Sequence, residues 1–284
     1  MRYGFHVSIV GGLRKAVDEA EIRKCSTIQI FSRNPQGWKF KELVPEDVAE
    51  FRSGVGRLDI SPVVVHMPYL ANIGTPDKTL YRKSIESVAV DLVRCSQIGA
   101  QYLVMHMGRS KASSEKDLVR RMVQAIDSAY ALARRNARAA ELPRLLLENT
   151  ASMPTDFHQL RAVIRAVGKT SPTGVVLDTA HLFEAGWELR TMSGLDRMLR
   201  DFDAQVGIQR LYLLHLNDSK TDVGSHLDRH WHIGKGRIGR KGFDLIVNHP
   251  LLRHLPGIME TPRRGVKEDR MNLRAITALT RPVR

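Results

Sequence analysis

Eight short apolar runs, each followed by a stretch with helical periodicity, restrict the fold of this 284-residue chain more than any other feature. The runs do not alternate between apolar and polar residues, which indicates strands buried on both faces, as in a parallel sheet. The expected strands are residues 5–7, 27–31, 63–65, 102–105, 145–147, 175–177, 211–214 and 258–259. The expected helices are residues 13–24, 46–55, 78–98, 115–139, 155–167, 194–206, 243–247 and a C-terminal segment from Lys267.

This order predicts an α/β protein with a (β/α)8 TIM barrel and an active site at the C-terminal ends of the strands. No Gly-x-Gly-x-x-Gly follows the first run, which argues against an open dinucleotide-binding sheet. No linker, low-complexity run or shift in composition divides the chain. We therefore expect one domain over residues 1–284.

The charge of the chain favours a polyanionic partner. Lys and Arg number 44 against 30 Asp and Glu, which gives a net charge of +14. Because phosphate neutralisation dominates nucleic-acid binding, such an excess is typical of nucleic-acid-binding proteins, although a generally basic proteome would also produce it.

The compartment is inferred from the cysteines and from the absence of long apolar runs. Cys25 and Cys95 form no Cys-x-x-Cys pair and are expected to be buried thiols in a reducing compartment. The N-terminus lacks a signal-peptide pattern, and no run of eighteen apolar residues occurs. We expect a cytoplasmic protein with no membrane partner.

Six consecutive expected strands, the third to the eighth, end at residue types that bind metals. These residues are His66, His106, Glu148, Asp178, His215 and Glu260. In a parallel barrel the C-terminal strand ends converge on one mouth, so the fold would gather all six. A single histidine at a strand end is more often structural, but six in register would need six independent structural explanations.

The stretch 211–239, LYLLHLNDSKTDVGSHLDRHWHIGKGRIG, adds further candidate ligands. Asp228 and His230 can reach one cation if the loop bends correctly, although a solvated polar loop is the structural alternative. With His181 of the segment DTAH, the set has nine members. Imidazole and carboxylate without thiolate suit Zn²⁺, with Mn²⁺ or Fe²⁺ as substitutes, and nine ligands serve about three ions. Four carboxylates against three Zn²⁺ leave two positive charges, which would attract a phosphodiester.

Seven segments occur in the order found in a known family. They are FHVSIVGGL, IFSRNPQGW, HMPYLANIGTPD, LLLENTA, VVLDTAHLFEAGW, HLNDSKTDVGSHLDRHWHIGKGRIG and METP. Over nearly its whole length the chain resembles the endonuclease IV family of zinc-dependent apurinic/apyrimidinic endonucleases, also called deoxyribonuclease IV. The long segment after the seventh strand is the most specific part of this resemblance.

The resemblance implies three zinc sites and a DNA-repair reaction. The implied sites are His66, His106 and bridging Glu148; Glu148, Asp178, His215 and Glu260; and His181, Asp228 and His230. The implied activity is hydrolysis of the phosphodiester 5′ to an abasic site in duplex DNA by a metal-bound hydroxide, which leaves a 3′-hydroxyl and a 5′-deoxyribose phosphate. Glu148 and Glu260 are the implied catalytic residues, and a monomer is the implied state.

Candidate DNA contacts come from the resemblance and from loop positions. Tyr69 and Leu70 match the family loop that enters the minor groove opposite the lesion; a structural aromatic beside a strand end is the alternative. Gln36 is also a candidate DNA contact, although Gln36 and Gly37 stand where well-known members carry arginine and glutamine, so gap-filling by this loop is not implied. Strand-to-helix loops also carry candidate phosphate contacts, namely Arg33, Lys220, Arg229 and Arg237.

Two alternatives remain at this point. A metal-dependent sugar isomerase or epimerase would use the same barrel, but it would need neither a third ion nor a charge of +14. A non-catalytic DNA-binding module would leave nine converging ligands unexplained.

Overall fold

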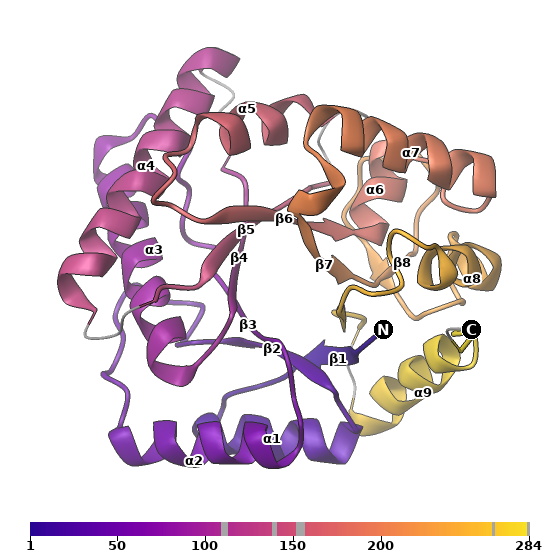
Figure 1. Cartoon of the computed structure of the whole chain (residues 1–284), viewed down its shortest axis with the longest axis horizontal. Helices are drawn as coiled ribbons and strands as arrows, with labels where there is room; N and C mark the ends of the chain where they lie inside the picture. The colour runs from indigo at the N-terminus through magenta and orange to yellow at the C-terminus, as the bar shows by residue number, and fades with distance from the viewer. Residues whose placement is uncertain (109–112, 138–140, 152–156, 263–264, 283–284) are drawn as a thin grey trace.

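Eight parallel strands close into a barrel in the computed structural model, which describes residues 1–108, 113–137, 141–151, 157–262 and 265–282. The strands follow one another around the barrel in chain order, and the last pairs with the first (Figure 1). They are β1 (Tyr3–His6), β2 (Thr27–Phe31), β3 (Val63–His66), β4 (Tyr102–His106), β5 (Arg144–Glu148), β6 (Thr173–Asp178), β7 (Leu211–His215) and β10 (Gly257–Met259). The predicted (β/α)8 barrel is therefore confirmed.

Helices surround the barrel, as Figure 1 shows. They are α1 (Leu13–Arg23), α2 (Pro45–Arg57), α3 (Lys78–Ile98), α4 (Glu115–Asn136), α5 (His158–Ala166), α6 (Thr179–Ala185), α7 (Met192–Gln205), α8 (Gly239–Asn248) and α9 (Val266–Thr277), with a 3-10 turn at Ile208–Arg210. Local signals explain their ends: the Asp77 carboxylate caps the first turn of α3, and Gly99 ends that helix with φ 77°. Within the described part of the chain, no helix is long and apolar enough to cross a membrane.

The strands are apolar on both faces because each face packs against a different layer. Six side chains fill the barrel interior: Val64, Val104, Leu146, Val176, Leu213 and Ile258. Their neighbours along the strands, such as Val63 and Val65, face the larger core between the barrel and the helices. Burial on both sides explains why the sequence shows continuous apolar runs instead of alternation.

Several expected boundaries differ from the structure. β1 begins at Tyr3, two residues before the expected start, because Tyr3 pairs with Gly257 of β10. Three features were not predicted: the short helix α6, the 3-10 turn at Ile208–Arg210, and the two-stranded antiparallel sheet of β8 (Asp218–Ser219) and β9 (His230–Trp231). The expected helix ends at residues 138–139 and 155–156 lie outside the described residues.

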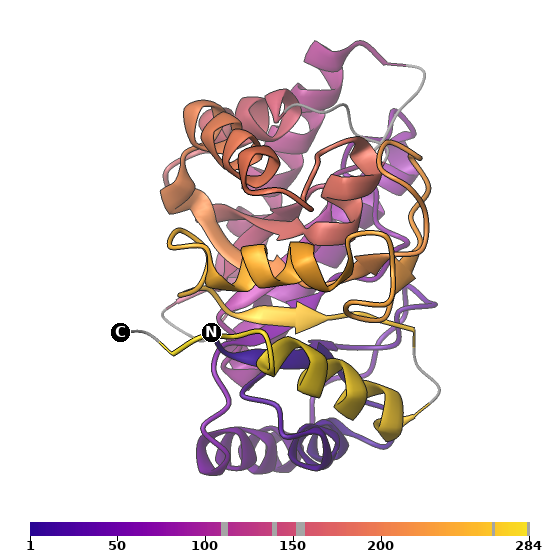
Figure 2. The same cartoon turned by 90° about the vertical axis from the view of Figure 1, so that its right-hand side faces the viewer.

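The barrel has one end suited to a site. Figure 2 shows the strand arrows pointing away from the end at which both termini lie. Six of the nine predicted ligands stand at or directly after the C-terminal ends of the strands: His66, His106, Glu148, Asp178, His215 and Glu260. The strand pairing places His106 opposite Glu148 and Asp178 opposite His215, so ligands from neighbouring strands lie side by side.

Candidate metal centre

The first group of ligands forms around one oxygen of Glu148. His66 Nε2 lies 3.3 Å and His106 Nε2 lies 3.2 Å from Glu148 Oε2. The donor atoms of the three residues lie within 4.8 Å of one another, which is close enough to share one ion. His66 and Glu148 are buried, whereas His106 is partly open to solvent.

The second group forms on the other side of the same carboxylate. His215 Nδ1 lies 3.0 Å from Glu148 Oε1, 3.4 Å from Glu260 Oε2 and 3.9 Å from Asp178 Oδ2. These four residues also keep their donor atoms within 4.8 Å of one another. Glu148 therefore points one oxygen at each group, which is the arrangement of a carboxylate that bridges two cations.

The third group joins α6 to the loop after β7. His181, His230 and Asp178 bring their donor atoms within 4.8 Å of one another. Asp228 Oδ1 approaches the same place, 3.5 Å from His181 Nε2 and 3.6 Å from His230 Nε2. The structure thus adds Asp178 to the predicted trio and connects the second and third groups through it.

The histidine rings are oriented by acceptors on their far sides. His66 Nδ1 lies 2.7 Å from the Met67 carbonyl oxygen, and His181 Nδ1 lies 3.0 Å from that of Asn149. An acceptor there draws the ring proton to Nδ1, so the nitrogen facing the carboxylates presents a lone pair. Lone pairs and carboxylate oxygens that converge on common points fit divalent cations.

The electrostatics keep the carboxylates ionised. Burial raises the pKa of Glu148 and of Glu260, but the surrounding histidines outweigh it and hold both pKa values well below the usual range; these are His106 and His215 for Glu148, and His215 above all for Glu260. In return, burial lowers the pKa of His215, but the charges of Glu260 and Glu148 outweigh it and raise that pKa to about 9. Burial lowers the pKa of His106. Where no cation is bound, protons on buried histidines balance the carboxylates.

Residues that the sequence analysis did not assign to the site hold the ligands in place. Gln29 accepts from His215 Nε2 at 2.9 Å and donates to Glu260 Oε1 at 2.5 Å. Asn217 donates to Asp178 Oδ2 at 2.6 Å and accepts from the Glu260 backbone at 2.7 Å. An amide inside the apolar run 27–31 was the available signal for Gln29, because a buried polar group needs a partner.

Most of the candidate DNA contacts are exposed in the described structure. Tyr69 is 68% exposed and Leu70 is 37% exposed, and the Tyr69 ring centroid lies 5.5 Å from that of His66. Gln36, Lys220 and Arg229 are exposed as well. Arg237 is exposed beside Asp222, at 3.4 Å.

Arg33 is a correction, because its guanidinium is buried and faces inward. It donates to both carboxylate oxygens of Asp91 on α3, at 3.1 and 2.9 Å, and to Ser87 Oγ at 2.5 Å. An arginine held by a buried carboxylate is not free to meet a phosphate. Arg33 instead anchors the loop between β2 and α2 to α3.

Comparison with known proteins identifies the family. The chain is 42% identical over 286 residues to "Probable endonuclease 4" of Methanosphaerula palustris, with 99% of each chain covered. It is 41% identical over 267 residues to the protein of that name from Halothermothrix orenii, covering 93% of this chain and 94% of the relative. The chain belongs to the endonuclease IV family.

Solved structures agree with this assignment. The crystal structure of endonuclease IV from Thermus thermophilus superposes with a TM-score of 0.85 at 34% identity and covers 98% of both chains. A family model described as "Xylose isomerase-like TIM barrel" matches residues 17–279. A 3-keto-D-glucoside 4-epimerase from E. coli has a TM-score of 0.67 at 12% identity, which shows a shared fold alone. The predicted endonuclease IV-type enzyme is confirmed.

Proposed function

We propose that this endonuclease IV family member hydrolyses the phosphodiester 5′ to abasic sites in duplex DNA, leaving a 3′-hydroxyl and a 5′-deoxyribose phosphate. The observation that carries the proposal is the position of Glu148 between two ligand groups, with a third group adjoining through Asp178. A bridged pair with a neighbouring third site suits an in-line displacement at phosphorus. The family assignment supports the same reaction.

The proposed cofactor is three Zn²⁺ per chain, with Mn²⁺ or Fe²⁺ as substitutes. The donors are imidazole nitrogens and carboxylate oxygens, which these ions accept. The proposed ligands are His66, His106, Glu148, Asp178, His181, His215, Asp228, His230 and Glu260. When bound, such ions lower the pKa of water and neutralise charge on a phosphate and its leaving oxygen. Four carboxylates against three divalent ions leave a net charge of +2, which attracts a phosphodiester.

The residues of the chain itself would orient the reaction and bind the strand. Glu148 and Glu260 are the proposed catalytic residues, because both belong to the second group and approach His215 Nδ1, at 3.0 and 3.4 Å. Lys220 and Arg229 would contact phosphates from the loop beside the third group. Tyr69 and Leu70, with Gln36 on a neighbouring loop, would contact DNA at the lesion.

The remaining expectations are also proposals. We infer that residues 1–284 form one domain, since the first strand, β1, pairs with the last strand, β10, and closes a single barrel. The net charge of +14 suits double-stranded DNA as the partner. A monomer in the cytoplasm is consistent with this function.

Cleavage of an end-labelled duplex with a single tetrahydrofuran abasic analogue tests the proposal. This analogue cannot undergo β-elimination, so a nick has to come from phosphodiester hydrolysis. The expected product is a nick 5′ to the analogue with an end that a DNA polymerase extends. An intact duplex after incubation with fully metal-loaded protein would overturn the proposal and direct attention to sugar substrates.

A further inference from the structure

Helix α6 carries a buried acid that belongs to none of the three ligand groups. Glu184 is 0% exposed and lies about one turn after the ligand His181. The helix itself begins at a ligand, because Asp178 Oδ1 accepts from the His181 backbone at 3.0 Å. Burying a carboxylate is unfavourable unless hydrogen bonds compensate for the lost water. The contacts of Glu184 therefore indicate why an acid stands there.

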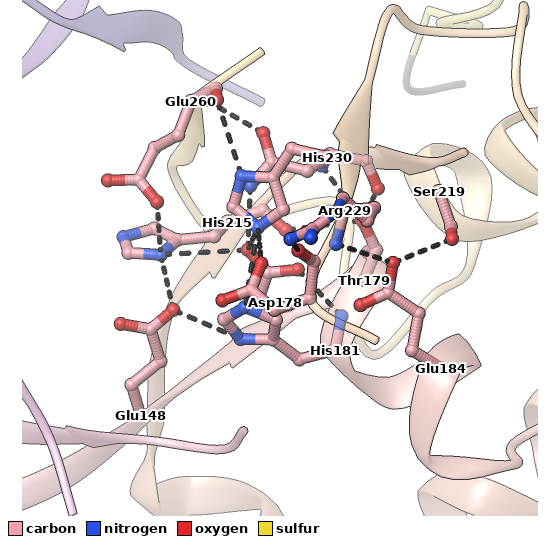
Figure 3. Close-up of polar contacts among 12 residues, drawn as sticks. Glu148, Asp178, Thr179, His181, Glu184, His215, Ser219, Arg229, His230 and Glu260 are labelled. Carbon is pink, nitrogen blue, oxygen red and sulfur yellow. Dashed lines mark hydrogen bonds and ion pairs between the residues drawn. The ribbon is translucent and has the colours of Figure 1, made fainter. Parts of the chain in front are cut away.

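One oxygen of Glu184 gathers three donors from the loop after β7. Oε1 accepts from Ser219 Oγ at 2.7 Å, from the Arg229 backbone N–H at 3.1 Å and from Thr221 Oγ1 at 3.4 Å. Figure 3 shows Glu184 reaching Ser219 and Arg229 on the side of α6 away from Glu148. Among the described residues, Oε2 has no hydrogen-bond partner. All the compensation that the structure describes for this side chain comes from that loop.

The bond to Arg229 falls between two ligands. Arg229 lies between the ligands Asp228 and His230 in the chain. The position of its backbone nitrogen therefore influences the positions of the Asp228 and His230 Cα atoms. Other bonds between α6 and the loop lie further back: Gly224 N donates to Phe183 O, and His226 N donates to Glu184 O. Arg229 O accepts from Lys220 N at 2.8 Å, but this bond lies within the segment that contains β8 and β9 and does not connect that segment to α6. Of these contacts, the bond from Arg229 N to the Glu184 side chain is the one that joins α6 to the loop between Asp228 and His230.

We propose that Glu184 is a positioning residue for the third cation site. By holding the Arg229 N–H against α6, it keeps Asp228 and His230 at the separation from His181 that lets one ion bind all three. The inference rests on the proposed trinuclear centre and adds to it a residue that sets the affinity of one ion. Loss of a group that orients ligands typically weakens metal binding about 10- to 100-fold.

The test compares variants by the metal that they retain, which is independent of activity. Wild-type protein, Glu184→Ala and Glu184→Gln are loaded with Zn²⁺, dialysed against graded chelator and analysed for zinc per chain. Wild type should retain three ions per chain. Glu184→Ala should lose one of them at a free zinc concentration about 10- to 100-fold higher than the one at which wild type loses it. Glu184→Gln should behave as wild type, because an amide oxygen accepts the same bonds. Hydrogen exchange at residues 226–231 should quicken in Glu184→Ala alone.

Asp127 offers a matched control. It accepts from a backbone N–H and a serine hydroxyl, Gly168 N at 3.1 Å and Ser171 Oγ at 2.7 Å, and it holds the loop before β6 at the opposite end of the barrel. Asp127→Ala should lower the melting temperature and leave zinc retention unchanged.

The outcomes separate this proposal from the one on which it rests. A wild-type protein that holds two ions or fewer overturns the trinuclear centre and this inference together. If wild type holds three ions and Glu184→Ala binds the third ion with unchanged affinity, this inference alone is overturned. If Glu184→Ala does not fold, Glu184→Asp replaces it. The aspartate side chain is one methylene shorter than glutamate, so its carboxylate should not reach Arg229 N. Retention of the third ion with wild-type affinity by that variant is equally decisive against the proposal.

Discussion

His181 and His230 point their Nε2 atoms at each other across 3.3 Å, while each ring places Nδ1 against a backbone carbonyl oxygen. Two neutral rings that donate from Nδ1 would set two lone pairs face to face. Asp178 and Asp228 add carboxylate oxygens at the same place. A cation at this point removes the repulsion, and in its absence a proton has to do so; in agreement, the pKa of His181 is raised, since neighbouring carboxylates outweigh its burial.

Metal removal should therefore lower the stability of the fold. A ligand present at about a thousand times its dissociation constant stabilises the native state by about 4 kcal/mol per site. We expect chelator treatment to lower the melting temperature in differential scanning calorimetry and added Zn²⁺ to restore it. His230→Ala should retain two ions, whereas His158→Ala, which removes a histidine on α5 away from the cluster, should retain all three. A melting temperature that chelator does not change would contradict this reading of the cluster.

The metal-free protein should lose stability between pH 6.5 and pH 9. The pKa of His215 is about 9 in the folded protein, because the charges of Glu260 and Glu148 outweigh its burial, and its ordinary value is 6.5. Because the pKa of His215 is higher in the folded protein than in the unfolded chain, its protonation stabilises the fold. This contribution is complete below pH 6.5 and is lost as the pH rises through about 9. A shift of this size corresponds to at most about 3 kcal/mol. The lowered pKa values of Glu148 and Glu260 act in the opposite direction, since their contribution is present above 4.5 and lost in acid.

Urea unfolding of metal-free protein at pH 6.5 and pH 9 measures this effect. His215→Gln should be less stable at pH 6.5 and should show a smaller decrease toward pH 9. The same decrease in wild type and in His215→Gln would assign the pH dependence to other groups.

The sequence predicted the barrel and the convergence of the candidate ligands because the same physics governs both. Continuous apolar runs imply strands buried on two sides, and parallel strands in a closed barrel bring their C-terminal ends together. Once His106 and Glu148 stand at the ends of neighbouring strands, their meeting follows from strand register. The nine candidate ligands needed only this argument and the family resemblance.

The supporting residues were less accessible to sequence reasoning because their roles depend on side-chain direction. Arg33 lies on a strand-to-helix loop, as a phosphate contact would, but Asp91 of α3 turns it inward. Gln29 and Glu184 become meaningful only when segments far apart in the sequence pack together. Helix α6 has seven residues, too few for a periodic pattern, although Asp178 before it provides a capping signal.

Glu260→Gln should keep the fold and lose most of the activity. Gln29 donates to Glu260 Oε1, and a glutamine oxygen can still accept this bond, so packing around position 260 is preserved. The variant nevertheless removes a negative charge from the second group. We expect the single-turnover rate on the tetrahydrofuran duplex to fall more than about 100-fold. Loss of a residue that only hydrogen-bonds to a metal ligand typically costs about 10- to 100-fold, and Glu260 is a proposed ligand itself. Glu86→Gln, an exposed acid on α3, is the control, and wild-type cleavage by Glu260→Gln would argue against the assigned centre.

DNA binding should weaken steeply with salt, and Lys220 should account for part of the slope. Lys220 is exposed, and its ammonium lies 4.9 Å from the centroid of the Trp231 ring, beside the third group. Removal of one phosphate contact lowers the slope of log K against log salt by about 1. Lys220→Ala should show this change in binding measured by fluorescence anisotropy. Arg135→Ala, on the outer helix α4, should leave the slope unchanged; equal slopes in all three proteins would place the DNA elsewhere.

Tyr69→Ala should reduce discrimination for abasic DNA more than it slows chemistry. The ring is 68% exposed, and its centroid lies 5.5 Å from that of His66 and 5.7 Å from that of His106, so it is an exposed ring beside the first ligand group. An abasic nucleotide lacks pairing and stacking, so it leaves the helix at the lowest cost, and an aromatic ring can occupy the gap. Stacking on a ring contributes about 1–3 kcal/mol, so the affinity ratio of abasic to intact duplex should fall about 5- to 150-fold.

Tyr69→Phe retains the ring and separates stacking from loss of the hydroxyl. It should keep the affinity ratio close to that of wild type, and single-turnover rates at saturating enzyme should change little in either variant. If the ratio is the same in wild type and Tyr69→Ala, the ring serves the packing around His66 instead of lesion recognition. A fall in both the ratio and the saturating rate would show that Tyr69 also holds His66 and His106 in place, since its ring is in contact with both.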